Sequence, residues 1–415
     1  MKNVLLILAN LLVACSAFGQ TTWYEIPTGT SSRLNAIDFP SNNVGYIVGQ
    51  DTTILKTTDG GQTWTQLSLN GIGIAALSDD FRDIQFIDEN TGFLVAGYSG
   101  VYKTIDGAQS WTLVQHNMCF PETVFPFSES DYLIGGGDCF TGAKIDKVVN
   151  SVSTPASITA DGFWFDYEIV LEMSFSGSNR GLAALRNEYM LRTLDGGLNW
   201  DTIPVNVPGA ITSVVMVNDT LCYGGYEDPN SQGFGILKSI DGGLTWTQDV
   251  NSATFYYPTY LCVEAASNGD IYSGGFSSNS PGGLIFESTN GTSWDYQDVE
   301  QPINDMTSCG SDITFGVGDS GYLVVNTPVS ELSVDDLQLI DFEVYPNPFQ
   351  QEFMVNNSAN EKLEATLLDA SGRSVKTMYL ELGDNTVNCE GLKNGMYFLQ
   401  LIQGDTRIVE CIIKQ

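Results

Sequence analysis

The residues that look most capable of chemistry are a serine between glycines and the single histidine of the chain. Residues 318–321 read GDSG, and His116 is the one histidine. A serine hydroxyl beside a histidine that takes its proton can act as a nucleophile. However, residues 318–321 align with residues 97–100 of an earlier repeat, which lie in a predicted hairpin. One histidine also excludes an HExxH zinc site and argues against a histidine base, so we expect no catalytic residue, metal or cofactor.

A nine-residue motif, called here the phrase, recurs along the chain and indicates which structural element each residue belongs to. It occurs at residues 56–64, 103–111, 192–200 and 238–246, and a weaker copy ends at residue 294. Each is a form of the Asp-box, S/T-x-D-x-G-x-x-W. The acidic or amide side chain accepts hydrogen bonds from the turn, the glycines permit positive φ, and the Trp packs between neighbouring sheets. We predict a structural role for Asp59, Trp64, Asp106, Trp111, Asp195, Trp200, Asp241, Trp246, Asn290 and Trp294.

The spacing of the phrase predicts an all-β fold with a β-propeller. The tryptophans recur at intervals of 46 to 48 residues, except for one interval of 89 that hides a degenerate copy near Val149. Each interval holds four short predicted strands, which is the content of one blade. The chain start, residues 22–26, matches an outer strand, whereas the last repeat lacks one. We therefore predict a seven-bladed propeller over residues 20–327 that is closed by the N-terminal strand.

Residues 22–327 resemble the photosystem II assembly-factor-like and sortilin-like families of Asp-box (BNR repeat) propellers. The pairing of AIDFPSNNVGYIVG with ILKTTDGGQTW, and of IQFIDENTGFLVAG with VYKTIDGAQSW, carries the resemblance. The resemblance implies the architecture, but not an activity, because the same turns occur in sialidases, xyloglucanases, receptors and assembly factors. An assembly or chaperone-like role for exported proteins follows only by analogy with the family.

The enzyme class left open is an Asp-box glycoside hydrolase, sialidase-like or xyloglucanase-like. A sialidase needs an arginine cluster, a tyrosine nucleophile and two acidic groups. Arg192 replaces the lysine that opens the phrase, Arg33 and Arg82 precede inner strands, and a FRIP-like motif is missing. The other arginines of the predicted propeller are Arg180 and Arg186. We therefore predict a protein that is not an enzyme, with the glycoside hydrolase as the alternative.

A binding role rests on the loops after the second and fourth strands of each blade, which open on the face opposite the Asp-box turns. Several of these loops are long and rich in aromatic residues, so they could form a platform for a glycan or a protein surface. The alternative is that the rings pack down and anchor the loops. The candidate ligand face consists of Trp164, Tyr167, Tyr226, Phe234, Tyr256, Tyr257 and Phe276.

The sequence beyond the propeller predicts a linker at residues 328–340 and a small Ig-like β-sandwich at residues 341–415. Three motifs follow in order: YPNPF at 345–349, LxDxxGRxV at 367–375 and LxNGxYxLxL at 392–401. This module resembles the type A C-terminal sorting domain of the Bacteroidota type IX secretion system. The resemblance implies the type IX machinery as a partner through residues 341–415, and a tag that is commonly cleaved. Its motif residues are Pro346, Asn347, Pro348, Gly372, Gly395 and Tyr397.

The start of the chain and its net charge limit the localisation and the partners of the protein. Residues 1–19 have a positive start, an apolar core and an A-x-G end, as in a signal peptide, although Cys15 also lies in a lipobox-like sequence. No later stretch predicts a transmembrane segment. The formal charge of −33 excludes nucleic acid and anionic lipid surfaces as partners. We expect a secreted protein, or one on the outer-membrane surface after passage through the periplasm.

The cysteines do not suggest a metal site, because no C-x-x-C spacing occurs. Seven remain after removal of the predicted signal peptide, so at least one thiol stays without an intramolecular partner. The pairs to test first are Cys119 with Cys139 and Cys389 with Cys411.

Overall fold

The computed structural model describes two compact units, Met1–Leu332 (unit 1) and Ser333–Gln415 (unit 2). The described residues are 22–415 except 74–79, 98–99, 117, 141, 160–167, 208, 229–232, 252–261, 277–281, 290, 311, 328–341, 358–361, 370–372 and 404–405. The predicted signal peptide and Cys15 lie outside them. Among the described residues, no helix is long and apolar enough to cross a membrane.

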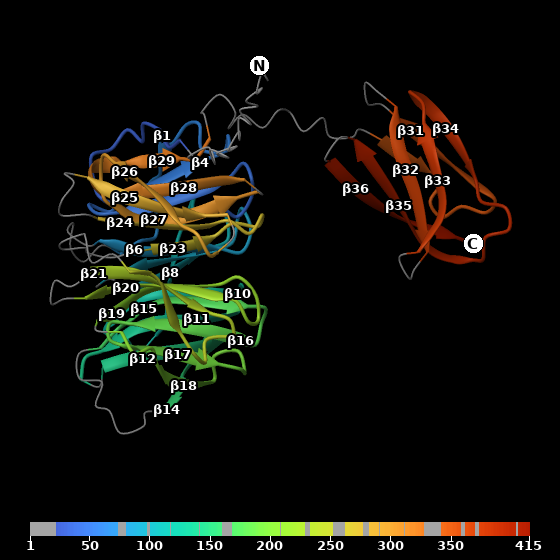
Figure 1. Ribbon diagram of the computed structural model, residues 1–415. Helices are drawn as coiled ribbons and strands as arrows, with labels where there is room; N and C mark the ends of the chain where they lie inside the picture. The colour runs from blue at the N-terminus through green and yellow to red at the C-terminus, as the bar shows by residue number, and fades with distance from the viewer. Residues whose placement is uncertain are drawn as a thin grey trace, which may run out of the picture. The chain divides into compact units, whose positions relative to one another are not determined.

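The described residues of unit 1 form seven sheets, in which antiparallel neighbours follow one another along the chain (Figure 1). In chain order the sheets are β2 (Leu34–Asp38), β3 (Gly45–Gly49), β4 (Ile54–Thr57) and β5 (Thr65–Gln66); β6 (Phe81–Phe86), β7 (Gly92–Ala96), β8 (Gly100–Thr104) and β9 (Thr112–Val114); β10 (Phe120–Ser128), β11 (Asp131–Asp138), β12 (Gly142–Val149) and β13 (Val152–Pro155); β14 (Ser157–Thr159), β15 (Val170–Ser176), β16 (Arg180–Leu185), β17 (Tyr189–Thr193) and β18 (Asn199–Pro204); β19 (Ala210–Met216), β20 (Cys222–Asp228), β21 (Gly233–Ser239) and β22 (Thr247–Asn251); β23 (Cys262–Ala265), β24 (Ile271–Phe276), β25 (Gly283–Ser288) and β26 (Asp295–Val299); and β27 (Ile303–Cys309), β28 (Ile313–Gly318), β29 (Leu323–Val325) and β1 (Tyr24–Glu25).

The sheets are arranged as a β-propeller. The first strands of the sheets, which are β2, β6, β10, β15, β19, β23 and β27, each contact the next one, and β27 contacts β2. The second strands β3 and β7 are buried along their whole length, because sheets pack against both of their faces. The outer strands β5 and β9 are short and mostly exposed. In these two sheets burial is therefore greatest in the second strand and least in the outer strand.

The first strand of the chain belongs to the last sheet of the ring. β1 pairs antiparallel with β29, with Tyr24 opposite Val325 and Glu25 opposite Val324. The sheet order is β1-β29-β28-β27, so the outer strand comes from the chain start and the other three strands come from the end of unit 1. This pairing joins strands that are about 300 residues apart and covers what would otherwise be an unpaired sheet edge.

Aromatic side chains fill the space between neighbouring sheets. Tyr46 of β3 stacks on Phe86 of β6 with ring centroids 3.8 Å apart, and Phe86 meets Trp111 edge to face at 6.4 Å. Phe39 stacks on Phe315 of β28 at 4.6 Å, which links the first sheet to the last. Offset and edge-to-face pairs of this kind add to the stabilisation from burial of apolar area.

The sheet of β10–β13 lacks an Asp-box. Its last turn runs through Asn150 and Ser151, which have φ of 50° and 66°, the conformation of a tight hairpin turn. β12 ends at Val149 and β13 starts at Val152. The next sheet has five strands, because β14 pairs parallel with β18. A different turn therefore replaces the box, and the hairpin stays intact.

Unit 2 consists of two antiparallel sheets. Their orders are β30-β31-β34 and β33-β32-β35-β36. Phe353 and Val355 of the first sheet share a hydrophobic core with Leu367 and Leu399 of the second. The strands are β30 (Phe342–Tyr345), β31 (Glu352–Asn357), β32 (Leu363–Asp369), β33 (Ser374–Leu380), β34 (Gly383–Asn388), β35 (Gly395–Gln403) and β36 (Thr406–Lys414).

Candidate ligand-binding site

A pocket of about 320 Å³ opens at the end of unit 1 where the first strands begin, called here the pocket end. Every first strand contributes to it, so it lies on the axis around which the sheets are arranged. Its lining residues are Arg33, Asn35, Ala36, Gln50, Asp80, Arg82, Asp83, Gln85, Glu122, Thr123, Val124, Leu171, Glu172, Met173, Arg186, Thr212, Ser213, Cys262, Asn304 and Asp305. Most of these side chains are polar.

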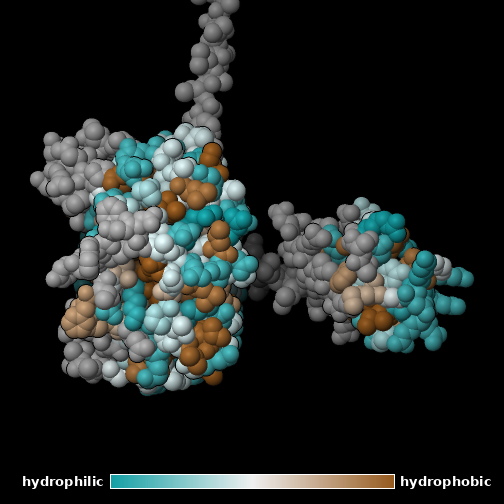
Figure 2. All heavy atoms as spheres, turned by 90° about the horizontal axis from the view of Figure 1, so that it is seen from below, coloured by the Kyte–Doolittle hydropathy of each residue, from teal (hydrophilic) through white to brown (hydrophobic). Residues whose placement is uncertain are grey.

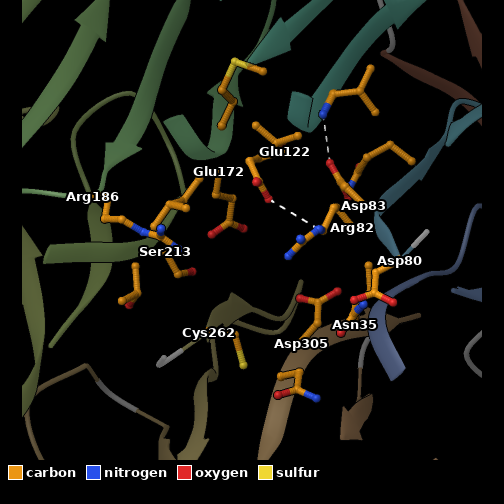
Figure 3. Close-up of a pocket in the computed structure, with 18 of the residues that line it drawn as sticks. Asn35, Asp80, Arg82, Asp83, Glu122, Glu172, Arg186, Ser213, Cys262 and Asp305 are labelled. Carbon is orange, nitrogen blue, oxygen red and sulfur yellow. Dashed lines mark hydrogen bonds and ion pairs between the residues drawn. The ribbon is translucent and has the colours of Figure 1, made fainter. Parts of the chain in front are cut away.

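Three arginines, Arg33, Arg82 and Arg186, form what we call the arginine mouth of the pocket. Arg33 Nε lies 3.2 Å from Asp319 Oδ1, and its Nη2 donates to Asn304 Oδ1 at 2.9 Å. Arg82 Nε lies 3.9 Å from Glu122 Oε2. Figure 3 shows the side chains of Arg82 and Arg186 directed into the opening from different sheets. The Arg33 and Arg82 side chains are each 40% exposed, so an incoming ligand can reach them.

Three carboxyl groups lie below the mouth, and each is held by the backbone of the neighbouring sheet. Asp83 Oδ2 accepts from Val124 N at 2.9 Å, and Glu172 Oε2 accepts from Val214 N at 3.0 Å. Asp305 Oδ2 accepts from Ile37 N at 2.9 Å. Each bond runs from one first strand to the next. These acids therefore link consecutive sheets across the ring as well as lining the pocket.

Two further carboxyl groups repeat this pattern deeper in the ring. Asp38 Oδ2 accepts from Phe86 N at 2.7 Å, and Glu264 Oε1 accepts from Ser308 N at 3.0 Å. Hydroxyl groups take the same place elsewhere, since Ser174 Oγ accepts from Met216 N and Ser213 Oγ accepts from Val263 N, both at 2.9 Å. We call Asp38, Asp83, Glu172, Glu264 and Asp305 the inner carboxyl ring.

The protein around the inner carboxyl ring favours the protonated form of its members. Desolvation raises the pKa of Glu172 to about 8 and the pKa values of Asp38 and Glu264 to about 7, despite the hydrogen bonds that lower them. Desolvation also raises the pKa of Asp83, and it raises that of Asp305 well above its usual range. By exposed area these residues are half-buried. Near neutral pH the arginine mouth therefore stands over a floor that is only partly charged.

Arginine donors stand at the opening of the pocket, and hydrogen-bonded carboxyl groups lie below them. Arginine presents a planar fork of donors that matches a carboxylate or phosphate. The acids below it are engaged by backbone N–H groups, and no group of three or more His, Cys, Asp or Glu side chains suited to a metal occurs in the described part of the chain. The pocket thus offers cationic donors at its opening and hydrogen-bonding groups below.

The Asp-box residues lie at the opposite end of the sheets, called here the Asp-box end. Asp106 Oδ1 accepts from Ser110 N at 2.9 Å and from Thr104 Oγ1 at 2.8 Å, and Asp106 Oδ2 accepts from Ser110 Oγ at 2.6 Å. The Ser110 hydroxyl and amide lower the pKa of Asp106. The same contacts recur at Asp59, Asp195 and Asp241. Each carboxylate organises its own turn and is not directed toward the pocket.

The box tryptophans close the same turns. Trp64, Trp200 and Trp246 donate from Nε1 to the carbonyl oxygens of Gly61, Gly197 and Gly243 at 3.0, 3.0 and 3.1 Å. Trp111 Nε1 has no such partner, and the matching glycine is replaced by Ala108, whose φ is 67°. Trp294 Nε1 instead donates to Asp249 Oδ2 at 2.8 Å. Asn290 lies outside the described residues.

The basic residue that opens the phrase fastens one box to the next. Lys56 Nζ donates to Gly107 O at 3.1 Å, and Arg192 Nε donates to Gly242 O at 2.7 Å. Lys238 Nζ donates to Gly291 O in the same way. Lys103, whose neighbouring sheet lacks a box, pairs with Glu129 at 3.2 Å.

The structure places the aromatic residues predicted for a ligand face in different situations. Tyr226 is a correction to that prediction, because it is only 3% exposed and its hydroxyl accepts from Gln248 Nε2 at 2.9 Å. It anchors the strand pair β20 and β21 from within. Phe276 is half-buried at the end of β24. Phe234 lies in β21, with a side chain outside the described set. The remaining four, Trp164, Tyr167, Tyr256 and Tyr257, lie outside the described residues.

The GDSG residues and His116 do not meet. Asp319–Gly321 form a 3-10 turn, η1, in which Ser320 has φ of 60° and Asp319 pairs with Arg33. His116 does not line the pocket, and its Nδ1 accepts from Met118 N at 3.2 Å. The tetrapeptide is thus a hairpin turn whose aspartate supports the arginine mouth.

The predicted sorting-motif residues shape one edge of unit 2. The Tyr345-Pro346 and Asn347-Pro348 bonds are cis, and Phe349 behind them is buried against Phe353 with ring centroids 5.0 Å apart. Asn347 Oδ1 accepts from Ile413 N at 3.0 Å, which ties the motif to the last strand. Gly395 has φ of 153°, and the Tyr397 hydroxyl donates to Lys393 O at 2.8 Å. Gly372 lies outside the described residues.

One cysteine pair forms a disulfide. Cys119 and Cys139 are bonded with Cα atoms 5.4 Å apart. Cys389 is a buried free thiol in this structure, so the pair with Cys411 is not formed. Cys222, Cys262 and Cys309 are also free and buried.

Sequence reasoning missed the pocket because its residues come from different repeats. Asp83 and Asp305 occupy equivalent places in their repeats, and Glu172 occupies the same place in a third. Aligning the repeats on their first strands would have shown acids recurring at one inward position. The pairing of these acids with backbone donors of the next sheet could not be read from that alignment.

Two family comparisons match separate parts of the chain. Residues 343–415 match the family described as secretion system C-terminal sorting domain. Residues 15–74 match the family described as photosynthesis system II assembly factor YCF48. The chain therefore resembles Ycf48 near its start and the sorting-domain family at its C-terminal end. A curated relative, the photosystem II assembly lipoprotein Ycf48 of Trichormus variabilis, is 35% identical over 80 residues. That match spans 18% of this chain and 22% of the relative.

Solved structures support the propeller fold of unit 1. YCF48 bound to a D1 peptide covers 73% of this chain and 96% of its own, with 16% identity and a TM-score of 0.56. YCF48 from Cyanidioschyzon merolae covers 73% and 98%, with 16% identity and a TM-score of 0.58. Virginiamycin B lyase from Staphylococcus aureus covers 73% and 98%, with 10% identity and a TM-score of 0.55. At these identities the likeness shows the fold alone.

Proposed function

We propose that this chain is an exported, non-catalytic binding protein whose propeller takes an anionic group of a polypeptide ligand at the arginine mouth. The observation that carries the proposal is the convergence of Arg33, Arg82 and Arg186 on one pocket of a chain with a formal charge of −33. A local cationic site on an acidic protein is a selective feature, because long-range attraction of anions is absent.

The choice of a polypeptide ligand draws on the relative that was solved with one. YCF48 has been solved with a D1 peptide bound, and unit 1 shares its fold. The pocket of this chain is lined mainly by hydrogen-bonding side chains, which suits a peptide backbone and its charged groups. An extracellular glycan with acidic groups is the other ligand that the mouth would accept.

Several features speak against an enzyme. A virginiamycin B lyase with the same fold was solved as a catalytically inactive His-to-Ala variant, whereas the one histidine of this chain lies outside the pocket lining. An Asp-box glycosidase requires two carboxyl groups free to face a glycosidic bond. In this chain one oxygen of each of Asp83, Glu172 and Asp305 accepts from a backbone donor of the next sheet, which gives these acids a structural task.

We further propose that the seven sheets of unit 1 are the blades of a seven-bladed propeller closed by the N-terminal strand, spanning residues 20–327. Residues 328–340 then serve as a linker, and residues 341–415 form an Ig-like sandwich that the type IX secretion machinery recognises. The protein is secreted or held at the outer-membrane surface after removal of residues 1–19. The sorting-domain match at residues 343–415 supports this route.

Binding is tested with a synthetic library of soluble hexapeptides that have free carboxyl termini, captured by the immobilised full chain and identified by mass spectrometry. We expect peptides with several carboxylates to be enriched. The double variant Arg82→Gln, Arg186→Gln should lose this enrichment, because it removes two of the three donors at the mouth. Arg180→Gln is the matched control, since Arg180 pairs with Asp219 outside the pocket. Equal enrichment by the wild type and the double variant would contradict the proposal.

Export is tested separately, by mass spectrometry of both ends of the protein recovered from culture medium and outer membrane of the native bacterium. We expect a new N-terminus at residue 20. Deleting residues 341–415 should leave the propeller in the periplasm. Unchanged secretion of the deleted form would contradict the role of the sorting domain.

A further inference from the structure

Phe140 is the most exposed of the large apolar side chains described in the structure. This residue is 90% exposed, whereas Phe120, the next most exposed of the described phenylalanines, is 39% exposed. It lies in the short turn between β11 and β12. A solvated phenylalanine ring offers apolar area for a ligand to bury.

The turn that carries Phe140 is held from two sides. Cys139, its neighbour, is bonded to Cys119, which directly precedes β10. The Phe140 amide also donates to Asp138 Oδ1 at 3.0 Å. These two restraints fix the backbone from which the ring projects. Holding the backbone of this turn in place lowers the conformational entropy that the turn loses when a ligand binds.

The turn lies at the pocket end of its sheet. β10 begins and β11 ends there, just as β2 begins beside Arg33 and β16 ends beside Arg186. Phe120, paired with Gly137, is 39% exposed and is the second aromatic residue at this corner. Glu122, two residues further along β10, contacts Arg82 of the mouth.

The separation between Phe140 and the mouth is within reach of a short peptide. Phe140 is three residues beyond Gly137, and Glu122 is two residues beyond Phe120. At about 3.3 Å per residue along the strands and about 5 Å across to the paired strand, the backbone of Phe140 lies roughly 17 Å from that of Glu122. About five extended residues of a ligand span that distance.

We propose that Phe140 and Phe120 form an apolar subsite that binds a hydrophobic side chain of the polypeptide whose anionic group occupies the arginine mouth. The inference rests on the proposed function and names the ligand class more closely: a peptide with a carboxylate and, within about five residues, a large apolar side chain. A phenylalanine ring without polar atoms favours an aliphatic or aromatic side chain over a sugar, whose hydroxyl groups need hydrogen-bonding partners as well as a ring to stack on.

The disulfide makes this subsite dependent on oxidation. Reducing the bond between Cys119 and Cys139 frees the turn while leaving the arginine mouth in place, since none of its residues belongs to this turn. Ring and mouth would then no longer be held at a fixed separation. The subsite thus suits a protein that binds its ligand after export to an oxidising compartment.

The test uses the same hexapeptide library with the full chain and three variants. The wild type should enrich peptides that combine a carboxylate with Leu, Ile, Phe or Met. Phe140→Ser should keep the enrichment of carboxylates and lose that of apolar residues, with about tenfold weaker binding of the best wild-type peptide. The double variant Cys119→Ser, Cys139→Ser should weaken the apolar preference several-fold. Ile240→Ser is the matched control, because Ile240 is 73% exposed at the Asp-box end.

The outcomes separate the inference from the proposed function. Enrichment of carboxylates alone, identical in the wild type and Phe140→Ser, overturns the apolar subsite and leaves the arginine mouth standing. No enrichment of any kind overturns both. An equal effect of Ile240→Ser shows a loss of general surface hydrophobicity and overturns the subsite. Retention of neutral polysaccharides by the wild type, lost in Phe140→Ser, overturns the peptide assignment.

Discussion

The Asp-box end and the pocket end of unit 1 are built from the same sheets, yet they use polar side chains in different ways. At the Asp-box end each carboxylate serves its own turn, as Asp106 does by accepting from Ser110 and Thr104. At the pocket end the carboxyl groups of first strands reach the next sheet, as Asp305 does by accepting from Ile37 N. The bonds at the Asp-box end repeat with the sequence phrase, whereas at the pocket end the accepting side chain, a carboxyl or a hydroxyl group, differs from one pair of sheets to the next.

The two ends also differ in how much of their surface is available to a ligand. The repeated end leaves little room for specificity, because its side chains are committed to the turns. The varied end combines arginines, half-buried carboxyl groups and the Phe140 corner in one region. Exposed apolar residues also occur at the Asp-box end, for example Ile240 and Leu244, and the face in Figure 2 shows separate hydrophobic patches among hydrophilic ones. The proposed ligand site is at the pocket end, because the pocket and its three arginines lie there.

The pH dependence of stability should separate the two ends most strongly. The members of the inner carboxyl ring have folded-state pKa values above their usual ones, so the folded state binds more protons than the unfolded chain between about pH 4 and 8. Their contribution is complete below pH 4 and is lost as the pH rises through about 7 to 8. The Asp-box carboxylates act oppositely, because Asp106, Asp195 and Asp241 have lowered pKa values and lose their contribution only in stronger acid.

Denaturant unfolding at fixed salt should therefore show a free energy of unfolding that falls by several kcal/mol from pH 4.5 to pH 9. These residues are half-buried, so the fall should be smaller than the sum of the individual shifts. Glu172→Gln removes the group with a pKa of about 8 and should flatten the curve between pH 7 and 9. A curve that rises over this range, or one that Glu172→Gln leaves unchanged, would show that the ring does not govern stability.

The tryptophan of an Asp-box should contribute in proportion to its burial. Trp200 is fully buried, so Trp200→Ala should lower the free energy of unfolding by about 3–5 kcal/mol. Trp64 is half-buried, and Trp64→Ala should cost less. Thermal and denaturant unfolding measure both. Peptide binding by the folded variants should match the wild type, and weaker binding by folded Trp200→Ala would break the division between the two ends.

The sequence predicts the features that depend on local turns and misses those that depend on packing between sheets. The propeller could be predicted, because a local phrase specifies each hairpin and its spacing specifies the blade. Of the two cysteine pairs put first for testing, Cys119 with Cys139 forms and Cys389 stays free. The pocket could not be predicted in detail, since Arg82 and Glu122 meet only after two sheets pack together. Tyr226 was expected on a surface, but its alternating position in β20 directs it into the core.

Substitution of a glycine in an Asp-box should cause the next largest loss in the free energy of unfolding. Gly197 has φ of 87°, and a Cβ there would lie 2.6 Å from Leu133 Cδ1 of the adjacent sheet. Gly197→Ala therefore combines an unfavourable backbone conformation with overpacking, and should cost about 2–4 kcal/mol in denaturant unfolding. Gly177→Ala serves as the control, because it has φ of 72° and no atom within 4 Å of the added Cβ. Equal losses for both would show that backbone conformation alone sets the cost.

The Asp-box at residues 103–111 allows the opposite substitution, alanine to glycine, for which we expect the smallest change in the free energy of unfolding. Ala108 stands where the other full boxes have glycine, at φ of 67°, and the neighbouring Trp111 Nε1 lacks a hydrogen-bond partner. Ala108→Gly should relieve the backbone and let the turn approach the form seen at Gly61, raising the free energy of unfolding by about 0.5–1 kcal/mol. The loss of one buried methyl group opposes this gain, which keeps it small. Gly107→Ala is the control: this residue, one position earlier, has φ of 69°, and the variant should be destabilised because its Cβ would lie 3.1 Å from Glu89 O.

Destabilisation by Ala108→Gly would mean that packing of the methyl group outweighs backbone strain, and that this box has adapted to alanine.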